Sequence, residues 1–70
     1  MRLARNERGS ADVGEASLIR GLAHVALGRR ADALTDAKLA VEALGAGYGP
    51  DHPLSREAAR LLATLEANWT

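Results

Sequence analysis

The two histidines are the side chains best suited to acid–base chemistry or metal binding, and neither has the neighbours that such chemistry needs. His24 stands among apolar residues, with no Asp, Glu, Cys or His four positions before or after it. We predict that it packs between helices with one ring nitrogen hydrogen-bonded locally. His52 follows Asp51, and the two could form an acid–base couple. Because Pro53 can begin a helix, we favour capping of that helix by both residues.

Three glycines that precede a helix invite comparison with a phosphate-binding loop. Such a loop follows a strand and points the first N–H groups of its helix at the anion. Here a helix, and not a strand, is expected before Gly45, Gly47 and Gly49. In addition, Pro50 and Pro53 have no N–H group to donate to an anion. Nucleotide binding is therefore disfavoured.

The remaining polar groups are interpreted as solvated surface. Ser17, His24 and Asp32 are the residue types of a hydrolytic triad, but nothing in the sequence suggests an oxyanion hole. Four arginines could form a basic patch, but carboxylates neutralise it and no aromatic residue is interleaved for base stacking. The arginines are Arg20, Arg29, Arg30 and Arg56, and the carboxylates are Asp32, Asp36 and Glu57. We expect no enzyme activity, no cofactor, no metal, and neither nucleic acid nor membrane as a partner.

Length and composition favour one small helical domain. The chain has 70 residues with nine acidic and nine basic side chains, so no net field draws it to a charged surface. Cysteine is absent, which excludes disulfides and thiolate metal sites. No apolar run approaches the roughly 18 residues that span a bilayer, and no apolar segment follows the charged start as in a secretory signal. We expect a cytoplasmic all-α protein.

The hydrophobic spacing predicts an antiparallel helix hairpin followed by a third helix. A short helical stretch over residues 1–8 is expected to break at Gly9-Ser10. Asp12 and Glu15 have the spacing of a capping box and should begin the first helix of the hairpin. Gly28 should end this helix by adopting positive φ. We accordingly divide the chain into a segment 1–11, which is disordered or ends a preceding helix, and a helical domain 12–70.

The second helix is predicted over residues 30–44. One stripe is apolar, and Asp32, Asp36, Lys38 and Glu42 are expected mostly to face water; the stripe is Leu34, Ala37, Val41 and Leu44. Ala33, Ala37 and Ala40 are small enough to let another helix come close. Residues 45–53, rich in glycine and proline, should form a loop, and the third helix should start near Pro53.

The spacing of small residues resembles the tetratricopeptide repeat. Gly21 and Ala63 stand 42 residues apart, and Gly9-Ser-Ala-Asp-Val precedes the first helix much as Gly49-Pro-Asp-His-Pro precedes the third. A small residue within the first helix, a glycine at the turn and Ala33 and Ala40 in the second resemble that family's framework. The length is similar to the longer repeat of kinesin light chains and of many bacterial regulators, and the chain would hold about one and a half repeats.

That resemblance implies a fragment of an α-solenoid that acts as a non-catalytic protein–protein interaction module. In the family, the first helix of each repeat lines a groove that takes a helix or peptide. The matching positions here are Glu15, Leu18, Ile19, Leu22 and Val25, then Glu57, Arg60, Leu61 and Thr64. Alternatives are self-association through the apolar helix faces, or a C-terminal scaffold or sensor region of a larger bacterial ATPase-type or transcriptional regulator.

The third helix carries more large apolar residues than one preceding hairpin is expected to cover. These are Leu61, Leu62, Leu65 and Trp69. Each such side chain left in water forfeits about 1.5–3 kcal/mol, which is large beside a typical stability of about 5–15 kcal/mol. We therefore expect these residues to form an interface with a second copy or another chain, or to be covered by residues 1–8. Alternatively, the chain is a fragment of a longer array, whose cut end exposes them.

Overall fold

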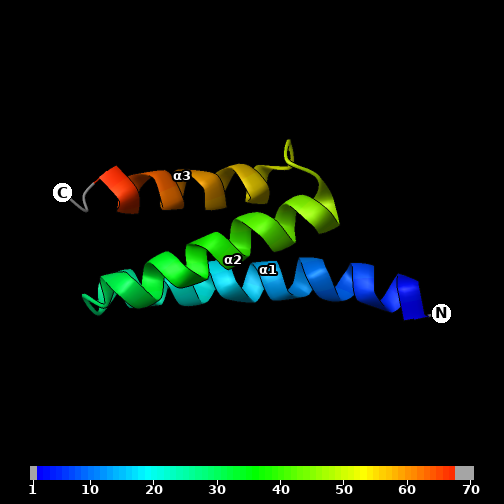
Figure 1. The fold of residues 1–70 in the computed structure, drawn as a ribbon, viewed down its shortest axis with the longest axis horizontal. Coiled ribbons are helices and arrows are strands. Elements are labelled where there is room, and N and C mark those ends of the chain that lie inside the picture. The colour runs from blue at the N-terminus through cyan, green and yellow to red at the C-terminus, as the bar shows by residue number, and fades with distance from the viewer. Residues whose placement is uncertain (1, 68–70) are drawn as a thin grey trace.

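The computed structural model is an all-α protein of three helices, as the sequence predicts. It describes the backbone of residues 2–67 and the side chains of residues 11–67. The helices are α1 (Arg2–Ala26), α2 (Arg30–Tyr48) and α3 (Pro53–Ala67), and residues 2–67 contain no strand. Figure 1 shows α2 between α1 and α3, with consecutive helices running antiparallel.

Helix α1 starts earlier than predicted and has no break at Gly9-Ser10. It runs unbroken from Arg2 to Ala26, across the boundary predicted between residues 11 and 12, so the capping box at Asp12 is wrong. A glycine within a helix costs only about 1 kcal/mol relative to alanine, which packing can offset. Ala11 supplies such packing, because it is buried against Gly47 of α2. The predicted likeness of residues 9–13 to the loop at residues 49–53 is therefore also wrong.

The turn after α1 confirms the prediction made for Gly28. This residue has φ 77°, in the left-handed region where glycine is favoured. Its N–H donates to the Val25 carbonyl at 3.0 Å, and the Arg29 N–H donates to the His24 carbonyl at 2.8 Å. These two bonds form a Schellman cap, which satisfies carbonyls that the helix end leaves without partners.

Helix α2 ends four residues later than predicted, at Tyr48 instead of Leu44. Gly45 and Gly47 lie inside the helix, and Gly49, with φ 95°, ends it. Gly47 is explained by close packing, because a Cβ atom there would lie 2.8 Å from the Cβ of Ala11. Glycine at this position therefore serves a helix contact and not a turn.

Helix α3 begins at Pro53 as predicted, and His52 caps it. The Leu54 N–H donates to Nδ1 of His52 at 3.1 Å, and the Ser55 hydroxyl donates to the Gly49 carbonyl at 2.7 Å. The His52 ring also stacks on Tyr48, with 4.2 Å between ring centres. The loop is thereby attached to both helices that it joins.

Small residues form the contact between α1 and α2. Ala33, Ala37 and Ala40 are completely buried, which confirms the prediction that another helix approaches closely there. Two clusters continue from this contact to α3. One joins Leu18, Ala40, Leu44 and Ala58, and the other joins Ala33, Ala37 and Leu65. Gly21 is buried in the α1–α2 contact, whereas Ala63, its predicted repeat counterpart, is exposed on α3.

Replacing Gly28 by alanine should destabilise the hairpin through backbone strain alone. No other group lies within 4 Å of a Cβ atom built at Gly28, so crowding does not contribute. We expect Gly28→Ala to lower the free energy of unfolding by about 1–2 kcal/mol, and Gly28→Asn by less, because asparagine tolerates left-handed backbone. Urea unfolding followed by circular dichroism measures both. Equal losses for the two variants would contradict this explanation.

Candidate functional site

The predicted groove residues of α1 fall into a buried and an exposed set. Leu18 is only 5% exposed and belongs to the core, so it is unavailable to a partner and its assignment is wrong. Ile19, Leu22 and Val25 are exposed by 68%, 47% and 43%. Glu15 is half-buried and accepts a hydrogen bond from the Tyr48 hydroxyl. The exposed set therefore forms an apolar surface on α1, which we call the α1 apolar face (Ile19, Leu22 and Val25).

Of the predicted groove residues of α3, Leu61 is the one that the structure places near α1. Glu57, Arg60 and Thr64 are exposed, and Leu61 is half-buried. Leu61 reaches α1, because a Cβ atom at Gly21 would lie 3.4 Å from its Cδ2 atom. The absence of a side chain at Gly21 thus lets α3 approach α1 at the level of Leu61.

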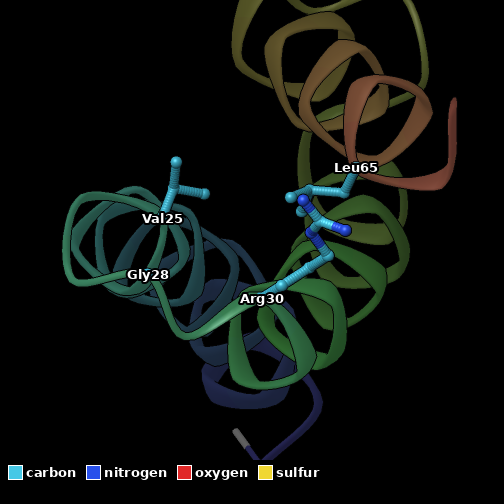
Figure 2. Close-up of a pocket in the computed structure, with 4 residues that line it drawn as sticks. All are labelled: Val25, Gly28, Arg30 and Leu65. Atoms are coloured by element: carbon cyan, nitrogen blue, oxygen red, sulfur yellow. The ribbon is translucent and has the colours of Figure 1, made fainter. Parts of the chain in front are cut away.

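A pocket of about 160 Å³ opens at the end of α1. Figure 2 shows Val25 of α1 and Leu65 of α3 on opposite sides of it, with the Arg30 side chain extending from the start of α2 toward Leu65. Gly28 completes the lining. Neither Gly28 nor Arg30 was predicted from the sequence to line a site. The Gly28 turn does predict that α1 and α2 meet here, but it does not place α3.

The hairpin covers part of the oligomer interface predicted on α3, so the expectation that Leu65 is uncovered is wrong. Leu65 is only 6% exposed, and Leu61 and Leu62 are half-buried against the same cluster. Alanines on α2 leave the space that these leucines occupy. Trp69 lies outside the described residues. Among residues 11–67, the large apolar side chains with exposed surface are mainly on α1.

Asp36 is buried between an arginine and a histidine of α1, although the sequence predicted that it faces water. It accepts a hydrogen bond from Nε of Arg20 at 3.1 Å, and its other oxygen lies 2.6 Å from Nδ1 of His24. Its side chain is 8% exposed. Gly21 leaves room for it, because a Cβ atom there would lie 3.3 Å from the Cβ of Asp36. His24 does pack between helices as predicted, but its partner belongs to α2 and is not local.

An aspartate that binds Nδ1 of a histidine is the orienting part of a hydrolytic triad. The serine and the aspartate that the sequence offers for a triad with His24 have other surroundings. Asp32 pairs with Arg29 at 2.8 Å, and Ser17 is buried. Within the described part of the chain, no group of three or more His, Cys, Asp or Glu side chains could hold a metal ion. We therefore interpret the Arg20–Asp36–His24 cluster as a structural contact that holds α1 and α2 together.

None of the helices in residues 2–67 combines the length and the apolarity that crossing a membrane requires. No family model, no curated protein and no solved structure matches this chain.

Loss of the buried carboxylate should weaken the α1–α2 contact. We expect Asp36→Asn to lower the free energy of unfolding by about 1–3 kcal/mol, because Arg20 and His24 lose their charged partner. Asp32→Asn is the control, because both members of its pair with Arg29 are largely exposed, and it should change stability by less than about 1 kcal/mol. Urea unfolding measures both variants. Equal effects would show that Asp36 does not link the helices.

Tyr48 offers a spectroscopic probe of the contact between the middle of α1 and the C-terminal end of α2. Its pKa is raised above the usual 10.0, first because its hydroxyl donates to the Glu15 carboxylate, and further through desolvation and the charges of Glu15 and Asp12. Glu15→Gln should lower this pKa toward 10.0, and Asp12→Asn should lower it less. Ultraviolet titration of tyrosinate measures both. An unchanged pKa in Glu15→Gln would exclude the contact.

Proposed function

We propose that this chain is a non-catalytic protein–protein interaction module of tetratricopeptide type, which binds a helix or peptide in the groove between α1 and α3. The observation that carries the proposal is the α1 apolar face. Its three large side chains stay exposed although smaller residues are fully buried beside them. Contiguous exposed apolar surface on a folded chain is typical of an interaction site.

The shape beside this face suits an elongated partner. Val25 lies at a pocket that Leu65 of α3 also lines, and Leu61 closes the gap beside Gly21. In this proposal α1 supplies the apolar wall of the groove, and α3, on which Glu57, Arg60 and Thr64 are exposed, supplies the other wall. A helix with apolar residues three and four positions apart would place them on the first wall and its polar residues on the second.

The arrangement of the helices also supports the tetratricopeptide type. A hairpin is followed by a third helix antiparallel to the second, and small residues fill the contact within the hairpin. The partner in this proposal needs no charge or metal for recognition. Its affinity would come from burial of Ile19, Leu22 and Val25, at about 25 cal/mol per Å² of apolar surface.

Selection from a phage-displayed library of random peptides tests the proposal with the full chain as bait. We expect enriched peptides with apolar residues at helical spacing, and Leu22→Glu should weaken their binding at least tenfold. Val13→Glu is the matched control, because Val13 is 48% exposed on the same helix but outside the α1 apolar face. Failure to enrich any peptide, or equal weakening by both variants, would contradict the proposal.

A further inference from the structure

The two histidines make hydrogen bonds of opposite kinds. Nδ1 of His52 accepts the Leu54 N–H at 3.1 Å, so this nitrogen carries no hydrogen in the folded chain. Nδ1 of His24 lies 2.6 Å from an oxygen of Asp36, and because an ionised carboxylate only accepts, this ring nitrogen donates. The fold therefore excludes a proton from Nδ1 of His52 and requires one on Nδ1 of His24.

Protonation of the His52 ring removes the cap of α3. The imidazolium form carries a hydrogen on both ring nitrogens, so it has no lone pair left for the Leu54 N–H. Its charge also lies at the N-terminal end of α3, where the partial charge of a helix is positive. Leu54 packs against the cluster that joins α3 to α2, so the cap holds part of that contact in place. Because the proton is taken up more readily once α3 has left its place, the docking of α3 weakens as the pH falls.

The charged and titratable groups around His52 do not replace this cap. The Tyr48 ring of α2 stacks on the His52 ring, and this contact is available to both forms of the imidazole. The Tyr48 hydroxyl donates to Glu15 of α1, so that carboxylate already has a partner. Asp51 in the loop and Arg56 on α3 are exposed and opposite in sign, so their effects on the ring oppose each other and are screened by solvent.

Protonation of His24 leaves the α1–α2 contact in place. Its Nδ1 already carries a hydrogen, so the added proton enters at Nε2 and the bond to Asp36 is retained. The imidazolium then places a positive charge beside a carboxylate whose side chain is 8% exposed. Arg20, the other partner of Asp36, is 55% exposed, so solvent screens its repulsion of the imidazolium. Arg29 and Asp32 neutralise each other in a separate pair.

We propose that His52 makes the docking of α3 sensitive to acid, so that α3 leaves the hairpin more often as the pH falls while α1 and α2 stay together. Histidine changes its charge between about pH 8 and about pH 5, which is the range of the response. Release of α3 separates Leu65 from Ala33 and Ala37 and exposes the apolar surface of all three. The acid response concerns the fold itself and is independent of the proposed peptide site.

Hydrogen exchange followed by mass spectrometry measures the opening of each helix in the full chain. The exchange is compared at about pH 7.5 and about pH 5.5, with labelling times scaled to the intrinsic exchange rate at each pH. We expect the protection of α3 amides to fall about fivefold on acidification, as for the loss of one helix cap, and the protection around Asp36 not to fall. Unchanged protection of α3, or an equal fall in all three helices, would overturn the inference.

Variants of the two histidines identify the group that responds. His52→Asn should retain the protection of α3 at both pH values, because its amide oxygen can accept the Leu54 N–H and does not titrate. His52→Ser supplies a second cap that does not titrate, and circular dichroism checks that each variant is helical. His24→Gln is the matched control, and its α3 should lose protection as in the unmodified chain. A fall that persists in both His52 variants, or that His24→Gln abolishes, would overturn the inference.

Discussion

The close approach of α1 and α2 is the constraint on which the rest of the structure depends. At two points the helices meet without room for a side chain. A Cβ atom at Gly14 would lie 2.6 Å from Cγ of Leu44, and one at Gly47 would lie 2.8 Å from the Cβ of Ala11. Leu44 is completely buried as a result, and it brings Leu18 and Ala58 into the same cluster. The chain has few aromatic residues. Its core therefore depends on the close approach of α1 and α2 and not on large side chains.

The same constraint determines which residues remain for a partner. Because small residues occupy the α1–α2 contact, Ile19 and Leu22 fall outside it, on the side of α1 that faces solvent. Gly21 has two effects, since its missing side chain admits Asp36 on one side and Leu61 on the other. The space for Asp36 lets this residue contact Arg20 and His24, which connects α1 with α2. The space for Leu61 lets α3 approach α1. The shape of the proposed groove therefore follows from a glycine.

Local rules predicted the features that depend on a few neighbouring residues. The turn at Gly28, the start of α3 at Pro53 with its His52 cap, and the buried alanines of α2 are all confirmed. The role of a glycine was predicted wrongly where it depends on a partner distant in the sequence. Gly47 looks like a loop residue in the sequence, but it lies in a helix because Ala11, 36 positions earlier, packs against it.

Side chains whose partners are remote in sequence were also predicted poorly. Asp36 looks like a surface residue on α2 until Arg20 and His24 of α1 are placed beside it. Leu65 looks uncovered until the alanines of α2 are seen to leave space for it. In both cases the error concerns a contact between helices, which periodicity within one helix does not specify. The tetratricopeptide type and its groove stay predictions that binding experiments address.

The most direct measurement of the central claim is the free energy of unfolding of Gly14→Ala beside that of Gly45→Ala. Both glycines lie inside helices, but a Cβ atom meets Leu44 at the first and nothing within 4 Å at the second. If close approach holds the hairpin together, Gly14→Ala should lose about 1–3 kcal/mol, and Gly45→Ala should gain up to about 1 kcal/mol from helix propensity. A gain at both positions would show that the helices are further apart than described and would contradict the account.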